Sequence, residues 1–216
     1  MGKSKDIKEA VRAELVFDPL VDDTAIEVQN LEGDVRLSGI VPSYSQYLEA
    51  ADAARRVAGV KRGHNHLEVV LPDWAVRDDA TLSDIANNAL LWDVTVPVGV
   101  EASAKDGNIT LTGTVAYGSQ RIAAEGAVAG LTGVRGIKNR IEISPDADPV
   151  DVEILVSDAL DRYALFDDSE VTVLIDGSTV TLAGYVRTWA EHDAVVLAAW
   201  MANGVLEVKD DLSITG

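Results

Sequence analysis

The sequence predicts an α+β protein made of three tandem αββαβ two-layer sandwiches, each a small three-stranded sheet with two helices on one face. Two series of glycines support the threefold repeat, because both recur at spacings of 74 and 71 residues along the 216-residue chain. The first series lies inside strand patterns and the second precedes valines: Gly39, Gly113 and Gly184; Gly59, Gly133 and Gly204. Two markers that keep one register indicate a triplicated unit of about 70 residues, which is large enough to fold alone.

Each unit is expected to begin with an amphipathic helix. Apolar residues recur at helical spacing in residues 7–15, 82–90 and 152–160. One apolar stripe along a helix is the pattern of a helix that packs its stripe against a core.

A β-hairpin is expected after this helix. Each unit has a turn that contains glycine, at residues 32–34, 105–108 and 176–178, and glycine readily adopts the positive φ that tight hairpins need. The strand after each turn alternates apolar and polar residues, as in a strand with one buried side. One face of each sheet should therefore be buried and the other largely wet.

An alanine-rich second helix and a third strand complete each unit. The second helices are predicted at about residues 43–58, 119–131 and 188–202. The glycines of the second series lie where a C-terminal helix cap favours a left-handed residue. The third strands are predicted at residues 64–69, 138–143 and 209–214.

Stretches rich in proline and aspartate mark the boundaries between the units, at residues 71–79 and 144–149. The predicted domains are residues 3–72, 79–145 and 146–216. The formal net charge of −18 is concentrated in the third domain, which has 3 basic and 15 acidic side chains and a net charge of −12. We expect no nucleic-acid partner, because an acidic protein repels the phosphate backbone.

The composition excludes several classes of protein. The chain has no cysteine, which excludes disulfides, thiolate metal sites and thiol catalysis. Its first residues lack the apolar segment of a secretory signal, so we expect a cytoplasmic location unless a signal has been removed. No apolar run approaches the roughly 18 residues that a transmembrane helix needs, so the protein is not expected to span a membrane.

No pattern in the sequence predicts catalysis or a cofactor. The Gly-x-Ser-x-Gly elbow and the glycine-rich phosphate loops are both missing from the sequence. We therefore expect a protein that is not an enzyme and that binds no cofactor. Three aspartate pairs lack the ligand spacing of a calcium loop and are expected at solvated loops or helix ends: Asp22-Asp23, Asp78-Asp79 and Asp167-Asp168.

Histidines and tryptophans are the other candidates for special roles. His64 and His66 share one face of a strand, a spacing that can chelate a metal, but no third ligand is evident nearby and no metal site is predicted. His192 is expected to be a solvated helix residue. Trp92 and Trp200 lie on apolar stripes and are predicted in the core, whereas Trp74 and Trp189 either pack between units or form exposed contacts.

Basic residues gather in the first two units, against the overall charge. They surround the end of the second helix and the strand that follows it, and they are the candidate residues for binding an anion or a partner: Arg55, Arg56, Lys61, Arg62, Arg121, Arg135, Lys138 and Arg140. The helix dipole explains part of this pattern, because it favours cations at a helix C-terminus. The alternative is a surface for lipid headgroups or for the acidic third unit of a neighbouring molecule.

The repeated unit resembles the BON domain (bacterial OsmY and nodulation). The resemblance rests on the glycine in the second strand, the Gly-Val after the second helix, and an asparagine or aspartate six residues after that glycine, at Asn65, Asn139 and Asp210. It covers nearly the whole chain. The resemblance implies a non-catalytic protein of osmotic or envelope stress that binds phospholipid surfaces or other proteins.

The leading hypothesis is therefore a non-enzymatic adaptor that binds an anionic phospholipid surface or a protein partner through its first two units. The alternative is a self-associating scaffold, in which the basic residues of one molecule meet the acidic third unit of another, or a module that responds to cations such as potassium. A homo-oligomer is possible under the second hypothesis.

Overall fold

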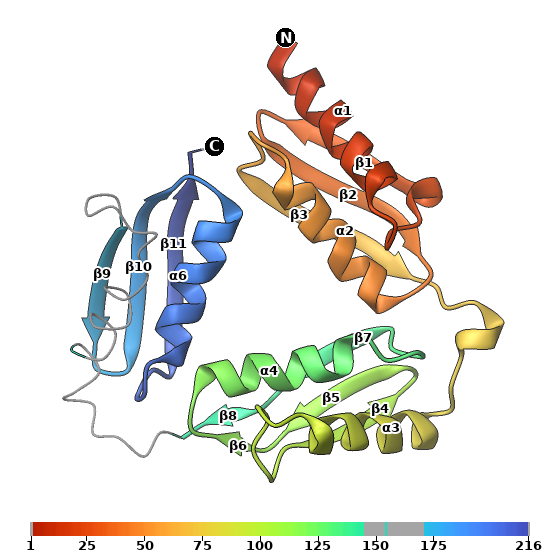
Figure 1. The fold of residues 1–216 in the computed structure, drawn as a ribbon, viewed down its shortest axis with the longest axis vertical. Coiled ribbons are helices and arrows are strands. Elements are labelled where there is room, and N and C mark those ends of the chain that lie inside the picture. Colours follow the sequence, from red (N-terminus) through yellow and green to blue (C-terminus); the bar gives the residue numbers. More distant parts are fainter. Residues whose placement is uncertain (1, 145–153, 155–170, 216) are drawn as a thin grey trace.

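The computed structural model of the chain describes residues 2–144, 154 and 171–215. Figure 1 shows three separate α/β units in which helices pack on small sheets. Three-stranded sheets packed against helices, repeated three times, confirm the predicted fold class. The helix predicted at residues 152–160 lies outside the described residues, apart from Ile154.

The first unit contains both predicted helices and all three strands. In chain order the elements are α1 (Gly2–Phe17), η1 (Asp23–Ala25), β1 (Ile26–Leu31), β2 (Asp34–Val41), α2 (Tyr44–Arg56) and β3 (Arg62–Val69). The sheet has the order β1-β2-β3, with β1 antiparallel and β3 parallel to β2. The parallel pair is joined by α2, as in a βαβ crossover.

The second and third units follow the same plan. After η2 (Asp73–Ala75), the second unit has α3 (Asp79–Trp92), β4 (Glu101–Lys105), β5 (Asn108–Thr112), β6 (Thr114–Val115), α4 (Gly118–Ala129), β7 (Gly136–Asn139) and β8 (Glu142–Ile143). The described part of the third has β9 (Val171–Asp176), β10 (Thr179–Val186), α6 (Trp189–Met201) and β11 (Glu207–Ile214). The sheets have the orders β4-β5-β7, with a short β6-β8 pair, and β11-β10-β9.

Each unit has its own hydrophobic core between helices and sheet. In the first unit Val11 and Leu15 of α1 are buried against Leu37 of β2. In the second unit Leu82 of α3 is buried against Ile109 of β5. The apolar stripes of α1 and α3 therefore each cover the sheet of their own unit, as predicted.

The strand glycines are required by a close approach of two backbone segments. Gly39 and Gly113 have φ of +121° and +132°. A Cβ at Gly39 would lie 2.0 Å from the Ala25 carbonyl oxygen, and one at Gly113 would lie 2.4 Å from the Gly99 carbonyl oxygen. Only glycine fits both the conformation and the space.

The glycines of the second series have positive φ but do not cap the helices. The helix caps are Val57, Gly130 and Ala202, two or three residues before Gly59, Gly133 and Gly204. The predicted cap position was wrong, because each helix ends earlier and a short turn leads into the third strand. The glycines supply the left-handed residue of that turn.

The three second helices connect the units. Tyr44, Gly118 and Trp189 are the first residues of α2, α4 and α6 and occupy corresponding positions in the repeat. Tyr44 packs against the core of the second unit, and a Cβ at Gly118 would lie only 2.0 Å from Cε3 of Trp200 in the third unit. The indole Nε1 of Trp189 donates a 3.0 Å hydrogen bond to the Val60 carbonyl of the first unit.

These contacts close a ring. In Figure 1, α2, α4 and α6 line the inner side of the arrangement. Each helix uses its N-terminal residue to contact the next unit, and the last contact returns to the first unit. Contacts between corresponding but different surfaces can close into a ring in this way.

Candidate binding surfaces

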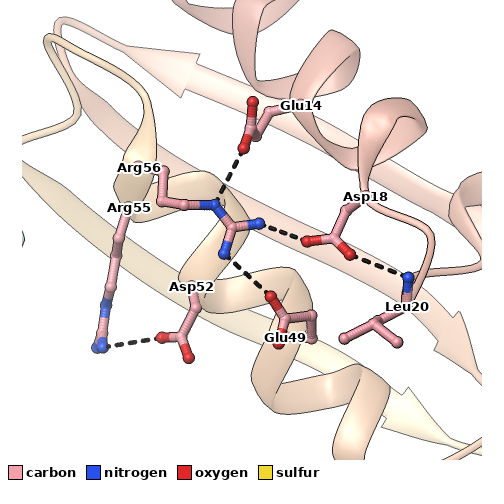
Figure 2. A network of polar contacts seen from close by, with 7 residues as sticks. All are labelled: Glu14, Asp18, Leu20, Glu49, Asp52, Arg55 and Arg56. Atoms are coloured by element: carbon pink, nitrogen blue, oxygen red, sulfur yellow. Dashed lines mark hydrogen bonds and ion pairs between the residues drawn. The ribbon is translucent and has the colours of Figure 1, made fainter.

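Arg56, one of the predicted binding residues, lies inside a network of carboxylates (Figure 2). Its guanidinium donates to Glu14 at 3.0 Å and to Glu49 at 3.0 Å, and it also pairs with Asp18. The hydrogen bond from the Leu20 backbone N–H, with further bonds from Arg56, lowers the pKa of Asp18. Because three carboxylates from α1, the turn after it and α2 surround Arg56, this side chain joins elements of the first unit and its charge is already balanced there.

Arg55 connects two units. It forms a 3.5 Å ion pair with Asp52 one turn away on α2, and its guanidinium carbon lies 4.9 Å from the ring centre of Trp189 in the third unit. A guanidinium over an indole face is a favourable cation–π contact. The structure thus places Arg55 at the contact between the first and third units.

Lys61 and Arg135 occupy corresponding positions before the third strands of their units. Both side chains are exposed, and their stems pack over the hairpin turns. A Cβ at Gly33 would lie 3.1 Å from Lys61 Cγ, and one at Gly107 would lie 2.9 Å from Arg135 Cδ. The two charges therefore flank the turns, at one end of each sheet.

The other predicted residues divide between the two sides of the sheets. Arg121 is half-buried on α4, where its backbone carbonyl accepts a 2.9 Å hydrogen bond from Nδ2 of Asn139. Arg62, Lys138 and Arg140 are exposed on the sheet face that no helix covers, which we call the open face. The eight predicted residues therefore do not form one continuous surface.

The open face of the second unit has a small excess of positive charge. Lys105 on β4, Lys138 on β7 and Arg140 after β7 are exposed on it, together with the two carboxylates of Glu101 on β4 and Glu142 on β8. Ile109 and Leu111 point to the core. Thr110 lies opposite Lys138 in the parallel pair of β5 and β7. Lys105 was not among the predicted binding residues, because its place on this face depends on the alternation of β4 relative to β5.

The open face of the first unit is mixed in charge. Arg36 of β2 lies opposite His64 of β3, and Nε2 of His64 lies 2.8 Å from a carboxylate oxygen of Asp34. The ring centres of His64 and His66 are 6.4 Å apart. In the described part of the chain no three side chains of histidine, cysteine, aspartate or glutamate come together as a metal site.

The open face of the third unit is acidic. Asp176 of β9 and Glu207 and Asp211 of β11 are exposed there, beside the single basic residue Lys209. Leu174 and Tyr185 on the same face are 60% and 57% exposed. The second and third units thus present equivalent faces of opposite charge.

The aspartate pairs take different places. Asp22 and Asp78 cap the N-termini of η1 and α3, as expected for helix ends. The carboxylate of Asp79 accepts hydrogen bonds from the backbone N–H groups of Asp106 and Gly107, at 2.9 and 3.1 Å, and so holds the second hairpin turn. Asp167 and Asp168 lie outside the described residues.

His192 is buried, so the prediction of a solvated histidine was wrong. Its Nε2 lies 2.8 Å from a carboxylate oxygen of Asp210, and its Nδ1 lies 2.9 Å from one of Asp193. The hydrogen bond to Asp193, together with Asp210, raises the pKa of His192 against the effect of its burial. The register would have revealed this role, because His192 corresponds to Tyr47 and Arg121, whose carbonyls accept hydrogen bonds from Asn65 and Asn139.

Exposed apolar residues gather at the ends of the first helices. Val16 and Phe17 end α1 with 67% and 82% of their surface exposed, and Leu91 and Trp92 end α3 with 74% and 83% exposed. The prediction that Trp92 lies in the core was wrong, because the buried stripe of α3 ends at Leu90 and Trp92, the last residue of the helix, lies outside it. Trp200 is only half-buried, and Trp74 is 75% exposed.

Neighbouring loop residues extend these two groups, which we call the apolar tips. Leu20 is 64% exposed beside Phe17, and Val94 and Val98 are almost fully exposed after Trp92. The tip of the second unit is an ordered turn, because the Asp93 carboxylate accepts hydrogen bonds from the backbone and the hydroxyl of Thr95, at 2.9 and 2.6 Å. The same pattern of apolar residue, aromatic residue and aspartate recurs in the third unit at Leu165, Phe166 and Asp167, which lie outside the described residues.

Within the described residues, no helix is long and apolar enough to cross a bilayer.

The chain matches the family model for the BON domain three times, at residues 3–70, 78–145 and 151–216. A relative is osmotically-inducible protein Y of Escherichia coli (strain K12), which is 32% identical over 137 residues, or 61% of this chain and 68% of the relative.

Two solved structures also match most of the chain. CdsD, a structural protein of the type III secretion system of Chlamydia trachomatis, matches 96% of this chain and 91% of its own, with 15% identity and a TM-score of 0.27. The periplasmic domain of PrgH matches 88% of this chain and 95% of its own, with 9% identity and a TM-score of 0.23.

Proposed function

The chain belongs to the BON domain family, and we propose on this basis that it is a non-enzymatic adaptor that docks on phospholipid surfaces through its apolar tips. Its similarity to osmotically-inducible protein Y supports a role under osmotic stress. The family match covers all three units, so a binding surface that is common to the family should lie at a feature that the units share.

The observation that carries the proposal is the repeated exposure of an aliphatic and an aromatic residue at one position of the fold. Scattered exposed apolar residues are normal on a soluble protein. Phe17 and Trp92, however, are more than four-fifths exposed at corresponding helix ends, each beside further exposed aliphatic residues. Aromatic side chains favour the boundary between water and lipid, because their rings sit well among headgroups.

The charge around the tip of the second unit supports lipid as the partner. Arg140 lies at the same end of the sheet as this tip, because its N–H bonds to the Leu111 carbonyl and Gly99 of the tip loop approaches Gly113. An arginine beside an apolar tip can bind a lipid phosphate while the tip enters the headgroup layer. The strongly acidic third domain would remain away from an anionic surface.

Vesicle co-sedimentation tests the proposal. We expect the protein to bind vesicles of phosphatidylglycerol and phosphatidylcholine. The double variant Phe17→Ser/Trp92→Ser should lose at least about tenfold in affinity, because these two aromatic side chains would supply most of the apolar contact with the membrane. Both residues are exposed, so the fold should change in stability by less than about 0.5 kcal/mol.

Tyr185→Ser is the matched control, because Tyr185 is an exposed aromatic residue on a different surface. This variant should bind vesicles like the unaltered protein. Equal binding by the tip variant and the control would reject the tips as the docking site. No binding of any vesicle by the unaltered protein would reject lipid as the partner and leave a protein partner as the alternative.

A further inference from the structure

The open faces of the second and third units carry opposite charge at two corresponding positions. Lys105 and Arg140 of the second unit correspond in the repeat to Asp176 and Asp211 of the third. Lys138 corresponds to Lys209, which has the same charge, and Gly136 corresponds to Glu207. The two faces have the same backbone, an antiparallel and a parallel strand pair in the same order, so the two reversed charges have the same spacing on both faces.

These charged side chains form few contacts within the described part of the chain, where Glu207 accepts a 3.3 Å hydrogen bond from the Thr179 hydroxyl. None of the three basic residues Lys105, Lys138 and Arg140 takes part in an ion pair there, nor does any of the acidic residues Asp176, Glu207 and Asp211. Arg56, by contrast, is surrounded by three carboxylates. The open faces are therefore charged surfaces that the fold leaves free.

The two open faces of one molecule cannot pair with each other. The second and third units contact each other through α4 and α6, where Gly118 meets Trp200. These helices cover the opposite sides of the two sheets from the open faces. A basic open face therefore requires an acidic open face from a second molecule.

We propose that the chain self-associates head to tail, the basic open face of the second unit docking on the acidic open face of the third unit of another copy. The pairing covers the exposed Leu174 and Tyr185 of the acidic face, which adds apolar contact to the ion pairs. Because each molecule contributes only one small sheet face, we expect the interface to be weak, and because its charges are exposed, we expect it to be sensitive to salt. Because the two docking faces differ, an assembly of any length keeps an unpaired basic face at one end and an unpaired acidic face at the other.

This inference goes beyond the proposed function, because neither open face includes the apolar tips. Lipid docking and self-association share Arg140, but they can still fail separately, because Phe17 and Trp92 take part only in the first and Asp176 and Asp211 only in the second. The first is measured with vesicles and the second with the protein alone.

Charge reversal tests the self-association. One variant carries Lys105→Glu and Arg140→Glu, and the other carries Asp176→Lys and Asp211→Lys. Sedimentation velocity at low salt should show concentration-dependent association of the unaltered protein, and each variant alone should lose at least about tenfold in association constant, because attraction becomes repulsion. An equimolar mixture of the two variants should associate again, since each retains the face that complements an unaltered face of the other.

Control variants hold the net charge equal. Arg12→Glu/Arg62→Glu changes the total charge as the first variant does, and Glu9→Lys/Asp84→Lys changes it as the second does, at exposed residues outside both faces. These controls should associate like the unaltered protein. A protein that stays monomeric at low salt up to high concentration, or a mixture of the two variants that does not regain association, overturns the proposal.

Discussion

A single aspartate at position 210 changes how the third strand is tied to the second helix. In the first two units an asparagine Nδ2 donates to a helix carbonyl, that of Tyr47 or Arg121. Asp210 has no such donor, and the ring of His192 supplies a hydrogen bond from the helix instead. The other carboxylate oxygen still accepts from the Leu212 N–H, as the asparagines do from their strands. Asp210 and His192 are thus compensating changes within one repeated contact.

This pair predicts that the third domain loses stability as the pH rises. The pKa of His192 is raised above its ordinary value of 6.5 by the hydrogen bond to Asp193 and by Asp210. A group with a raised pKa in the folded state contributes its full stabilisation below the unfolded value, and loses it as the pH rises through the folded value. The free energy of unfolding should therefore fall as the pH increases above 6.5.

Urea denaturation at several pH values measures this effect, with tryptophan fluorescence as the signal. The matched variant is Asp210→Asn, which restores the asparagine of the first two units and removes one carboxylate from His192. We expect a smaller dependence of the unfolding free energy on pH in this variant. The same pH dependence in both proteins would show that the Asp210–His192 contact does not cause it.

At the residue level the sequence predicted the composition of the surfaces better than their geometry. The basic cluster was visible, but two of the carboxylates that hold Arg56 come from α1 and the turn after it, 42 and 38 residues earlier in the chain. Such pairings depend on tertiary packing, which spacing along one strand or helix does not reveal. Trp92 was misplaced for the same kind of reason, because a hydrophobic stripe does not show where the helix leaves the sheet.

At the level of elements the repeat made the fold predictable. Three copies of one pattern give each helix and strand three independent signals, so weak local patterns support one another. The helix ends were less certain, since Gly59, Gly133 and Gly204 were assigned to caps and instead lie in the following turns. Turn conformations of this kind depend on backbone geometry that the residue type alone does not determine.

The strand glycines permit a direct test at this level. Gly113→Ala should destabilise the second domain by about 2–4 kcal/mol, because its φ is +132° and a Cβ would lie 2.4 Å from the Gly99 carbonyl oxygen. Gly126→Ala in α4 is the matched control, because no atom lies within 4 Å of a Cβ there. Alanine at this helical position should stabilise by about 0.5–1 kcal/mol. Thermal denaturation of both variants measures the difference, and equal melting temperatures would contradict the assigned close approach.

At the level of the whole molecule, corresponding residues of the three units have diverged to fit one another. The first residue of the second helix is a tyrosine in α2, a glycine in α4 and a tryptophan in α6. Gly118 leaves room for the large Trp200 of the third unit, and Trp189 binds the first unit by a hydrogen bond and a cation–π contact. Burial, with the nearby Glu125 carboxylate and Tyr47, raises the pKa of Tyr44. Each contact therefore uses a different pair of residues, although the units share one fold.

The contact between Gly118 and Trp200 gives the sharpest test of this ring. Gly118→Leu places a side chain where a Cβ alone would lie 2.0 Å from Trp200 Cε3, so we expect the contact between the second and third units to be lost at a cost of about 1–3 kcal/mol. Small-angle X-ray scattering should show a larger radius of gyration, while circular dichroism stays unchanged because the substituted residue lies on the outside of its own unit's core. Gly126→Leu is the control in the same helix, because that position faces open space, and it should leave the radius unchanged. An unchanged radius in Gly118→Leu would mean that the ring does not depend on this contact and that the third unit is positioned by Trp189 alone.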